Sequence, residues 1–288
     1  MNSPLTGRPS RKLFSTTVLG SIPVDYYRCA DTGFIHTETP HWLDRAYASA
    51  ITSLDLGYAS RNYQYADVVE RMLLRVAPDV GRCLDFGGGY GLFVRLMRDR
   101  GFDFYLEDAY CDNLFAVGFE VADLPENARD RFDAITLFEV LEHLPDPLPV
   151  LEGLFARTGL LVGSTELQPE PFEPTSPDDW WYFLPETGQH VSLYNRRSLE
   201  YIAEKLGGRL YTDGRTLHVI SRDPLPRDPF AAASTASVPQ RAARTLARWL
   251  QAPAPASGRP ENARESLLQQ DFERARRRLN DNEDGAAS

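Results

Sequence analysis

The chain has 288 residues, of which 42% are hydrophobic, and it carries a formal net charge of -10. This length fits one sizeable domain with appendages, or at most two domains, and the acidic charge argues against a nucleic-acid partner, which needs a basic surface. Three cysteines are too few for a disulfide framework, and no apolar run approaches the ~18 residues that cross a bilayer, so we expect a cytoplasmic protein without a membrane span.

The N-terminal part divides into two predicted segments. Residues 1–24 are rich in Ser, Thr and Pro, and we expect them to form a flexible N-terminus. Residues 25–60 contain an aromatic, hairpin-like piece and then a helix near Trp42–Ser53. We expect this second segment to form a lid or a wall for a substrate.

Residues 61–222 alternate strand and helix patterns, which predicts an α/β fold: a Rossmann-like, doubly wound sheet of seven strands with helices on both faces. The sheet is expected to be mostly parallel, but Asp213-Gly214 joins two alternating runs, a hairpin pattern that makes the last strand antiparallel. The expected helices lie at 63–76, 91–100, 147–157 and 196–206. The expected strands lie at 83–87, 103–108, 118–121, 133–138 and 159–165, followed by the two strands of the hairpin.

A short apolar strand that contains Asp85 runs directly into a glycine-rich turn and then a helix. The glycines let the backbone turn sharply and approach a ligand where a Cβ would collide, and the first N–H groups of the helix point back at the same place. The dinucleotide fingerprint G-x-G-x-x-G would need glycine at the position of Leu92, so a nicotinamide cofactor is disfavoured. A carboxylate at Asp85 would instead attract a cationic amino group. The glycines are Gly87, Gly89 and Gly91.

A second acid follows at the spacing of a nucleotide site. An acid about 20 residues beyond the glycines is where such a site places its acceptor for the ribose hydroxyls. The strand at 103–108 ends in two acids, and we assign this role to Asp108, with Glu107 as the substitute. Arg61, at the start of this region, is a candidate partner for the carboxylate of a cofactor.

The pattern Asp-x-Gly-x-Gly-x-Gly from Asp85 resembles motif I of the class I S-adenosylmethionine-dependent methyltransferases. The string from Phe132 to Pro147, FDAITLFEVLEHLPDP, resembles the fourth-strand motif of the same family, and the resemblance covers about residues 60–222. It implies S-adenosylmethionine as the cofactor and S-adenosylhomocysteine as the product. The residues assigned to cofactor binding are Asp85, Gly87, Gly89, Gly91, Asp108, Phe138 and Arg61.

Three further segments resemble bacterial methyltransferases that are encoded with glycan-assembly enzymes. They are Tyr27–Phe34, Thr37–Leu43 and Gly188–Tyr194. Relatives often carry C-x-x-C in the first segment, but here Cys29 is followed three places later by Thr32, so no zinc knuckle can form. The resemblance implies that the acceptor is sugar-containing or another small hydroxylated molecule, and that the reaction is O-methylation.

A long insert at residues 168–190 leaves the carboxyl end of the strand at 159–165, where ligands of open α/β sheets bind. Loops of this length without regular structure are usually functional or disordered, and its consecutive aromatic residues argue against disorder. We therefore expect Trp180, Trp181 and Tyr182 to bind the substrate as a wall. The alternative is an aromatic plug that closes the edge of the core.

Two histidines are candidates for removing the proton of an acceptor hydroxyl, which needs a base tuned near neutral pH. We assign this role to His190, with His143 and Glu139 as the other catalytic candidates. The pattern Glu139-x-x-Glu142-His143 can also be structural, capping and orienting the helix that follows. It also resembles the metal-binding triad of the small-RNA 2′-O-methyltransferases, which would make His190 a fourth ligand, but we expect no metal ligands here. His218, in the last strand, is expected to be a core residue.

Beyond residue 222 the composition changes to that of a linker, and residues 223–288 are expected to be a linker and a helical appendage that can be removed from the body. A basic helix is expected at 241–251, which leaves peripheral membrane contact open, and a second helix is expected at 261–279. An apolar stripe on the second helix suits a partner helix, as in a homodimer. The stripe consists of Leu268, Phe272, Ala275 and Leu279.

The sequence therefore predicts an enzyme that methylates a small-molecule or glycan acceptor with S-adenosylmethionine. The alternative enzymes are methyltransferases of secondary metabolites or of amines. From another class, the chain could be a catalytically inactive methyltransferase-like scaffold. The acids and glycines of the motif indicate that the chain binds the cofactor. They do not by themselves indicate that it catalyses methyl transfer.

Overall fold

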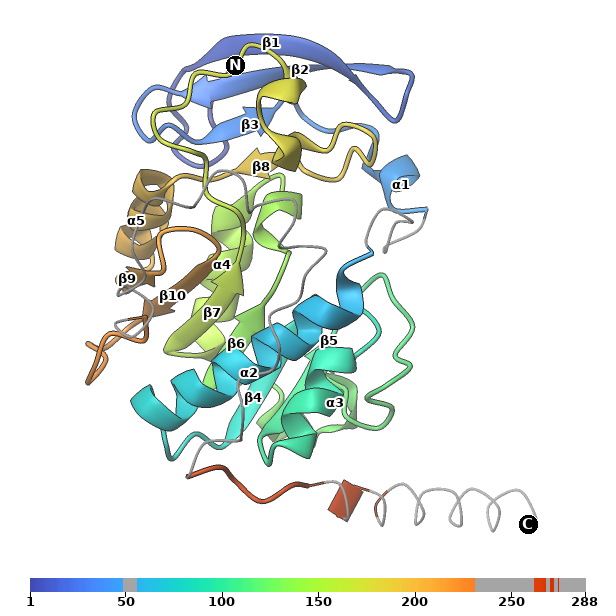
Figure 1. Ribbon diagram of the computed structural model, residues 1–288, viewed down its shortest axis with the longest axis vertical. Coiled ribbons are helices and arrows are strands. Elements are labelled where there is room, and N and C mark those ends of the chain that lie inside the picture. The colour runs from blue at the N-terminus through green and yellow to red at the C-terminus, as the bar shows by residue number, and fades with distance from the viewer. Residues whose placement is uncertain (49–55, 231–261, 268–269, 272–273, 275–288) are drawn as a thin grey trace, which may run out of the picture. The chain divides into compact units, whose positions relative to one another are not determined.

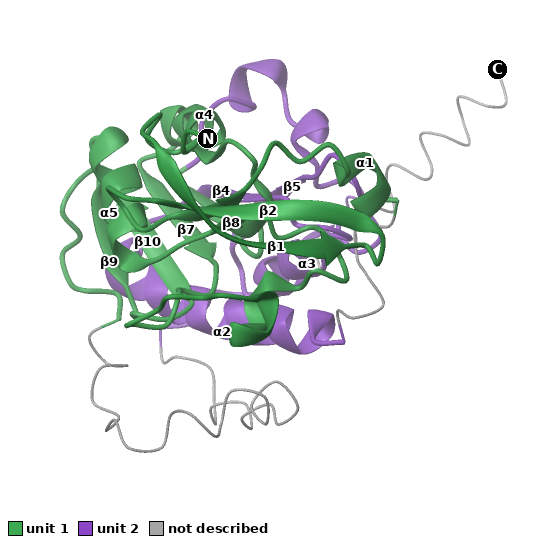
Figure 2. Cartoon of the chain, turned by 90° about the horizontal axis from the view of Figure 1, so that it is seen from above, with its two compact units in different colours: residues 1–54, 133–236 green, residues 55–132, 237–288 purple. Residues whose placement is uncertain are grey.

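The computed structural model describes residues 1–48, 56–230, 262–267, 270–271 and 274. The chain divides into two compact units, which Figure 2 shows in different colours. The first unit comprises Met1–Leu54 and Asp133–Ala236, and the second comprises Asp55–Phe132 and Ser237–Ser288. The division falls inside residues 61–222, which the sequence pattern treats as one domain.

The second unit contains the predicted succession of strand, glycine-rich turn and helix. Strands β4 and β5 pair in parallel, with Leu84 opposite Tyr105. Helix α2 buries Val69, Leu73 and Val76 along one side, at the spacing of an amphipathic helix. The elements of this unit are α2 (Tyr58–Val76), β4 (Arg82–Phe86), α3 (Leu92–Asp99) and β5 (Asp103–Glu107), with short 3-10 helices at Val121–Asp123 and Glu126–Ala128.

The α/β part of the first unit confirms the predicted hairpin. Strands β6 and β7 run parallel, whereas β10 is antiparallel to both β7 and β9. The elements are β6 (Ala134–Leu137), α4 (Pro147–Arg157), β7 (Leu160–Ser164), α5 (Arg196–Lys205), β9 (Arg209–Thr212) and β10 (Leu217–Ser221). Short 3-10 helices lie at Leu141–His143, Pro177–Asp179 and Trp181–Phe183.

The α/β sheet confirms the Rossmann-like class but not the number of strands. Its order is β5-β4-β6-β7-β10-β9, so the described part of the chain gives it six strands and not seven. The seventh strand is predicted at 118–121, where the structure has a single bridge between Leu106 and Glu120. Glu120 and Asp123 instead exchange hydrogen bonds between side chain and backbone. This capping box favours a 3-10 helix over a strand.

The N-terminal residues form strands, which corrects the expectation of a flexible segment at 1–24. Together with β8 they make a four-stranded antiparallel sheet in the first unit (Figure 1). Phe14 and Val18 are buried, whereas Ser15 and Thr17 between them are exposed. The polar composition of residues 1–24 therefore reflects hydroxyl side chains on the solvent-facing side of this sheet. The strands, in order across the sheet, are β1 (Ser10–Val18), β2 (Ile22–Cys29), β3 (Ile35–Thr37) and β8 (Ser192–Leu193).

The helix expected near Trp42–Ser53 is short in the structure. Helix α1 spans Leu43–Ala46. The remainder of the expected helix, from residue 49 onward, lies outside the described residues.

Part of the tail packs on the second unit, although the sequence predicts a removable appendage. The guanidinium of Arg98, buried in α3, donates to both carboxylate oxygens of Asp271 at 2.9 Å. Arg264 donates to the backbone oxygens of Pro78 and Val80, at 2.8 and 2.6 Å. These residues of the tail therefore belong to the fold of the second unit. The helix expected at 241–251 and the stripe residues Leu268, Phe272, Ala275 and Leu279 lie outside the described residues.

Candidate active site

The glycine-rich turn between β4 and α3 has a backbone that glycine adopts easily and other residues rarely adopt. Gly87, Gly89 and Gly91 have φ angles of 68°, 59° and 82°, all in the left-handed region. Gly91 is the N-cap of α3, and no side chain caps this helix. The first N–H groups of a helix attract an anionic group, so the turn presents a site for a carboxylate.

Asp85 lies directly against this turn and is buried. A Cβ built on Gly88 would lie 2.1 Å from Oδ2 of Asp85 and 2.7 Å from the side chain of Leu106. Gly88 is therefore required for the carboxylate to approach the backbone so closely. Gly88 is not among the glycines that the motif assigns to the site, although it is the middle one of three consecutive glycines.

Asp108 joins the turn after β5 to the glycine-rich turn. Its Oδ2 accepts the N–H of Gly89 at 2.8 Å, and its Oδ1 accepts the N–H groups of Tyr110 and Cys111, both at 2.8 Å. A carboxylate has about four lone-pair positions, so these three bonds leave one position on Oδ2 for a hydroxyl. Glu107, the substitute candidate, ends β5, and its backbone oxygen accepts the N–H of Gly87 at 2.8 Å.

The second unit fits the chemistry of S-adenosylmethionine at each of these points. The cofactor has a cationic amino group, a carboxylate and ribose hydroxyls. Asp85 supplies negative charge, the N-terminus of α3 attracts a carboxylate, and Asp108 has room to accept a hydroxyl. Arg61 lies in helix α2 of the same unit and is partly buried. Its pairing with the carboxylate of a cofactor stays a prediction.

The first unit carries the other half of the predicted motif, at the carboxyl end of β6. Phe138 follows this strand directly and is partly buried. Glu139 has a φ of 53°, a conformation that costs free energy in a residue with a Cβ and often marks a functional site. Ser164, at the end of β7, accepts the backbone N–H of Glu139 at 2.9 Å and donates to its Oε1 at 2.7 Å. This pair of bonds holds the unusual turn in place.

Glu142 is fully buried, with 0% of its surface exposed. Its Oε1 accepts the hydroxyl of Tyr182 at 2.6 Å, whereas its Oε2 has no hydrogen-bond partner among the described residues. Burial, reinforced by the charge of Glu139, raises the pKa of Glu142 to about 8. Such a perturbed acid is typical of functional sites.

The structure brings together the two histidines that the sequence places 47 residues apart. The ring centroids of His143 and His190 are 5.1 Å apart. Nδ1 of His190 lies 2.7 Å from the backbone oxygen of Tyr182, and Nδ1 of His143 lies 3.1 Å from that of Gln189. Because a carbonyl oxygen only accepts, Nδ1 of each ring carries a proton, and each ring in its neutral form has its lone pair on Nε2.

Glu142, His143 and His190 form one cluster, in which a ligand atom from each lies within 4.8 Å of the others. We call it the Glu–His–His cluster. Two of its members, His143 and His190, are catalytic candidates from the sequence. Glu139, the third candidate, lies three residues before Glu142, and its charge contributes to the raised pKa of that residue.

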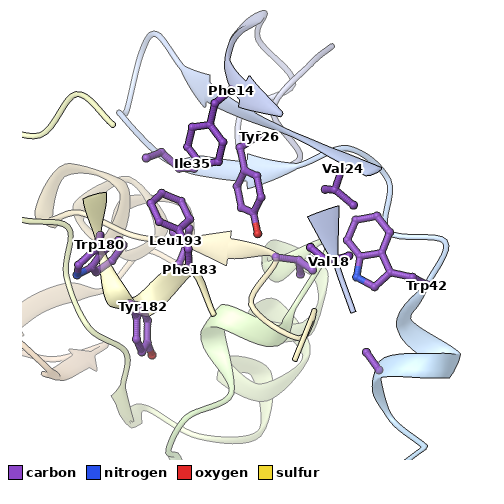
Figure 3. Packing of buried hydrophobic residues seen from close by; sticks show 12 residues of the cluster. Phe14, Val18, Val24, Tyr26, Ile35, Trp42, Trp180, Tyr182, Phe183 and Leu193 are labelled. Atoms are coloured by element: carbon purple, nitrogen blue, oxygen red, sulfur yellow. The ribbon is translucent and has the colours of Figure 1, made fainter. Parts of the chain in front are cut away.

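The aromatic insert forms part of a core, as Figure 3 shows. Phe183 packs edge-on against Phe14 and Tyr26 of the N-terminal hairpin, with ring centroids 5.2 Å apart in both pairs. The ring of Trp180 lies 5.7 Å from that of Phe183. The insert and the hairpin, far apart in the sequence, therefore share one hydrophobic cluster.

This packing corrects the expected acceptor wall for two of its three residues. Trp180 and Tyr182 are buried and present almost no surface to a ligand. The alternative of an aromatic plug describes them, because the rings of the hairpin cover the insert. Trp181 is 40% exposed and stays the candidate for contact with a substrate.

Glu166, just after β7, is a titratable residue that none of the sequence motifs includes. Burial raises its pKa to about 7, although Arg215, with its Nε 3.7 Å from Oε1, acts in the opposite direction. Its Oε2 has no hydrogen-bond partner among the described residues.

His218 is a core residue, as predicted. It is buried, and its ring nitrogens lie 2.9 Å from Oγ1 of Thr212 and 3.0 Å from the backbone oxygen of Thr165.

A family model described as a methyltransferase domain matches residues 58–212, more than half of the chain. The chain belongs to this methyltransferase family. The predicted class of enzyme, a class I methyltransferase with S-adenosylmethionine as its methyl donor, is thereby confirmed at the level of the family. No curated protein sequence matches the methyltransferase.

Solved structures of low sequence identity resemble the methyltransferase. CalO1, a methyltransferase in calicheamicin biosynthesis in its SAH-bound form, is 16% identical with a TM-score of 0.37, over 56% of this chain and 55% of that one. TnmH is 18% identical with a TM-score of 0.41, over 64% and 62%. An O-methyltransferase family protein from Burkholderia thailandensis is 16% identical with a TM-score of 0.42, over 54% and 55%. The methyltransferase thus spans 55–62% of their lengths, and this likeness carries no information about its substrate.

Within the described residues of the methyltransferase, no helix is long and apolar enough to cross a membrane. The cytoplasmic location, the peripheral membrane contact and the homodimer through the C-terminal helices stay predictions.

Proposed function

We propose that this methyltransferase transfers the methyl group of S-adenosylmethionine to a hydroxyl of a small acceptor, with sugar-containing molecules as the first class to test. The Glu–His–His cluster is the observation that carries the proposal. A hydroxyl has a pKa far above neutral, so its methylation benefits from groups that remove its proton. Two imidazoles with their lone pairs on Nε2, beside a buried carboxylate, supply such groups.

The cofactor is assigned to the second unit. Asp85 is proposed to face the amino group, and the N-terminus of α3 the carboxylate, with Arg61 as its partner. Asp108 is proposed to accept a ribose hydroxyl through the remaining position on Oδ2. Gly87, Gly89 and Gly91 leave room for the approach of the cofactor. Phe138, which the sequence also assigns to the cofactor, lies in the first unit, and its role stays a prediction.

The acceptor is assigned to the first unit. In the reaction, the hydroxyl oxygen forms a bond to the methyl carbon while the bond from that carbon to sulfur breaks. The bonding electrons remain on sulfur, which gives S-adenosylhomocysteine, and the hydroxyl proton is lost at the Glu–His–His cluster. His190 and His143 are proposed to act directly in this step, with Glu139 adding negative charge. Trp181 is proposed to contact the acceptor.

An amine is the second candidate acceptor. Glu139, Glu142 and Glu166 lie near the carboxyl ends of β6 and β7. Burial first, and the charge of Glu139 after it, raise the pKa of Glu142 to about 8 and that of Glu166 to about 7. A cationic substrate would favour the charged form of these acids, so the group would attract it.

Transfer of label from methyl-labelled S-adenosylmethionine tests the proposal without a guess about the acceptor. The full chain is incubated with a lysate separated into metabolites and glycans, and the labelled products are identified. Label on a hydroxyl oxygen is expected; label on nitrogen would favour the amine. If the chain binds the cofactor but labels nothing, while an unrelated active methyltransferase labels its substrate in the same lysate, the inactive scaffold is the better description.

A further inference from the structure

We propose that the tail segment 262–274 positions the cofactor site of the second unit, with Asp271 as its anchoring residue, so that docking of this segment and binding of the cofactor strengthen each other. The inference goes beyond the proposed function, since it depends on the cofactor and not on the acceptor. All residues that carry it belong to the second unit, and those of the tail are the described ones, 262–267, 270–271 and 274.

Gly101, just after α3, allows close contact with the tail. A Cβ built on it would lie 2.1 Å from the backbone oxygen of Glu265 and 2.6 Å from the Cβ of Arg264. Its φ of 86° suits a glycine after a helix, and the tail adds a second requirement. The guanidinium of Arg264 also donates to the backbone oxygens of Pro78 and Val80, at 2.8 and 2.6 Å. The backbone of the tail therefore lies directly on the end of α3.

Asp271 anchors the tail to α3 through a buried cluster of charges. Its side chain is 5% exposed, and that of Arg98 is 4% exposed. Arg98 donates from Nε to Oδ2 and from Nη2 to Oδ1, both at 2.9 Å, and Arg95 donates from Nη2 to Oδ2 at 2.9 Å. A bidentate pair of arginine and carboxylate fixes the relative orientation of its partners. The tail therefore holds α3 in one orientation through two side chains of that helix.

The other end of α3 belongs to the cofactor site. Gly91, the N-cap, accepts the backbone N–H of Arg95 at 3.1 Å. Arg95 thus joins the glycine-rich turn through its backbone and Asp271 through its side chain. Because a helix is a rigid element, a shift at Arg95 and Arg98 also moves the first N–H groups of α3, which attract a carboxylate.

Phe119 links the tail to the loop that carries Asp108. The guanidinium carbons of Arg98 and Arg274 lie 3.8 and 4.8 Å from the centroid of its ring, which are favourable distances for cation–π contacts. Its backbone oxygen accepts an N–H of β5 at 2.8 Å. Phe119 ends the loop that begins at Asp108, so the tail helps to hold the far end of this loop.

The same loop also contacts the glycine-rich turn. The N–H groups of Leu114 and Phe115 donate to the backbone oxygen of Tyr90, at 3.1 and 3.0 Å. The N–H of Gly89 donates to Oδ2 of Asp108. The turn, the loop and α3 thus form one connected network, which the tail contacts both at α3 and at the end of the loop.

Such a network couples two binding events. A cofactor that binds to a turn, a loop and a helix end that are already held in place loses less conformational entropy from the protein on binding. By linkage, the bound cofactor strengthens docking of the tail by the same factor.

Calorimetry tests the effect of the tail on the cofactor site. The full chain and Asp271→Asn are titrated with S-adenosylhomocysteine at a temperature at which circular dichroism shows both to be folded. We expect the Kd to rise by at least about 5-fold in the variant, the lower end of common coupling factors. A loss of stability alone would not change the affinity of the folded variant.

Two further variants separate the anchor from the rest of the segment. Glu265→Gln, which alters an exposed side chain of the tail, should bind the ligand like the wild type. Asp271→Glu, which keeps the negative charge beside Arg98, should bind it more tightly than Asp271→Asn does.

Hydrogen exchange of the wild type measures the reverse effect and keeps the test decisive if Asp271→Asn does not fold. The N–H of Leu267 donates to the backbone oxygen of Arg98 at 3.1 Å and reports docking of the tail. Saturating S-adenosylhomocysteine should slow its exchange by at least about 5-fold, because the coupling is reciprocal. Mass spectrometry of peptides that contain Leu267 measures the rate. Strand β1, in the first unit, should change less and is the control for a general effect of the ligand.

Unchanged affinity in the folded Asp271→Asn variant, or exchange of the tail that the ligand leaves unchanged, would overturn the proposal. A wild type that does not bind S-adenosylhomocysteine would overturn it as well. Neither measurement needs an acceptor. Coupled binding of the cofactor without any methyl transfer would therefore support this inference and count against the proposed function, whereas transfer with uncoupled binding would do the reverse.

Discussion

The backbone N–H of Gly89 donates to Oδ2 of Asp108 at 2.8 Å, which joins the glycine-rich turn to the turn after β5. Two further N–H groups bind the other oxygen of the same carboxylate. Asp108 is thus a structural acceptor for both turns and, with its remaining lone-pair position, a candidate acceptor for the cofactor. Because of these two roles, we expect replacement of Asp108 to weaken cofactor binding strongly.

Asp108→Ala is expected to weaken the binding of S-adenosylmethionine by about 1.5–3 kcal/mol, because a charged acceptor is lost and three N–H groups lose their partner. Isothermal titration calorimetry measures the affinity. Asp130→Ala, which alters an exposed acid of the same unit, should leave it unchanged. Equal affinity in the Asp108 variant and the wild type would remove Asp108 from the site.

Asp271→Asn is expected to destabilise the second unit by about 3–5 kcal/mol, because it breaks a buried ion pair and leaves the guanidinium of Arg98 short of negative charge. Urea unfolding, followed by circular dichroism, measures the change. Glu126→Gln, at an exposed position of the same unit, is the control. If Asp271→Asn unfolds like the wild type, residues 223–288 are removable, as the sequence alone predicts.

His190→Ala is expected to lower turnover by roughly 10²- to 10⁴-fold, the range for loss of a group that assists proton transfer. Affinity for S-adenosylmethionine should be nearly unchanged, because the proposed cofactor groups lie mainly in the other unit. Turnover is measured with an acceptor from the labelling screen, and affinity by calorimetry. Full activity in this variant would place the essential group elsewhere, with His143 next to be tested.

His143→Ala is expected to lower the free energy of unfolding by about 1–3 kcal/mol, because the backbone oxygen of Gln189 loses its donor. His41→Ala, which removes an exposed ring, should cost less. Thermal and urea unfolding compare the two variants. Equal stability of both would show that the bond to Gln189 contributes nothing measurable.

Glu166→Gln is expected to change how stability depends on pH. Since the pKa of Glu166 is raised in the folded state, from 4.5 to about 7, its contribution is fully present below pH 4.5 and is lost as the pH rises through about 7. The wild type should therefore lose stability relative to Glu166→Gln between pH 5 and 8, by at most about 3 kcal/mol. Urea unfolding at both pH values measures the difference. Glu186→Gln, at an exposed position, should follow the wild type, and parallel behaviour of Glu166→Gln would contradict the raised pKa.

Local sequence was enough to determine the motif of the second unit and the class of the fold. A strand, a glycine-rich turn and a helix are adjacent in the chain, and the positive φ angles of the three glycines are ones that glycine adopts without the cost of a Cβ. The hairpin of β9 and β10 was predictable for the same reason, since Asp213-Gly214 specifies its turn locally.

The tertiary structure alone decided the parts that depend on distant segments. Phe183 packs against Phe14 and Tyr26. This contact places most of the aromatic insert in a hydrophobic core and packs it against the N-terminal strands. Asp271 pairs with Arg98, and His190 lies beside His143 and Glu142. The residues of each group are far apart in the chain, so no periodic pattern in the sequence predicts that they meet. Hydrophobic burial and the pairing of buried charges are non-local interactions, so the sequence supplies the residues for them and only the folded chain shows which residues meet.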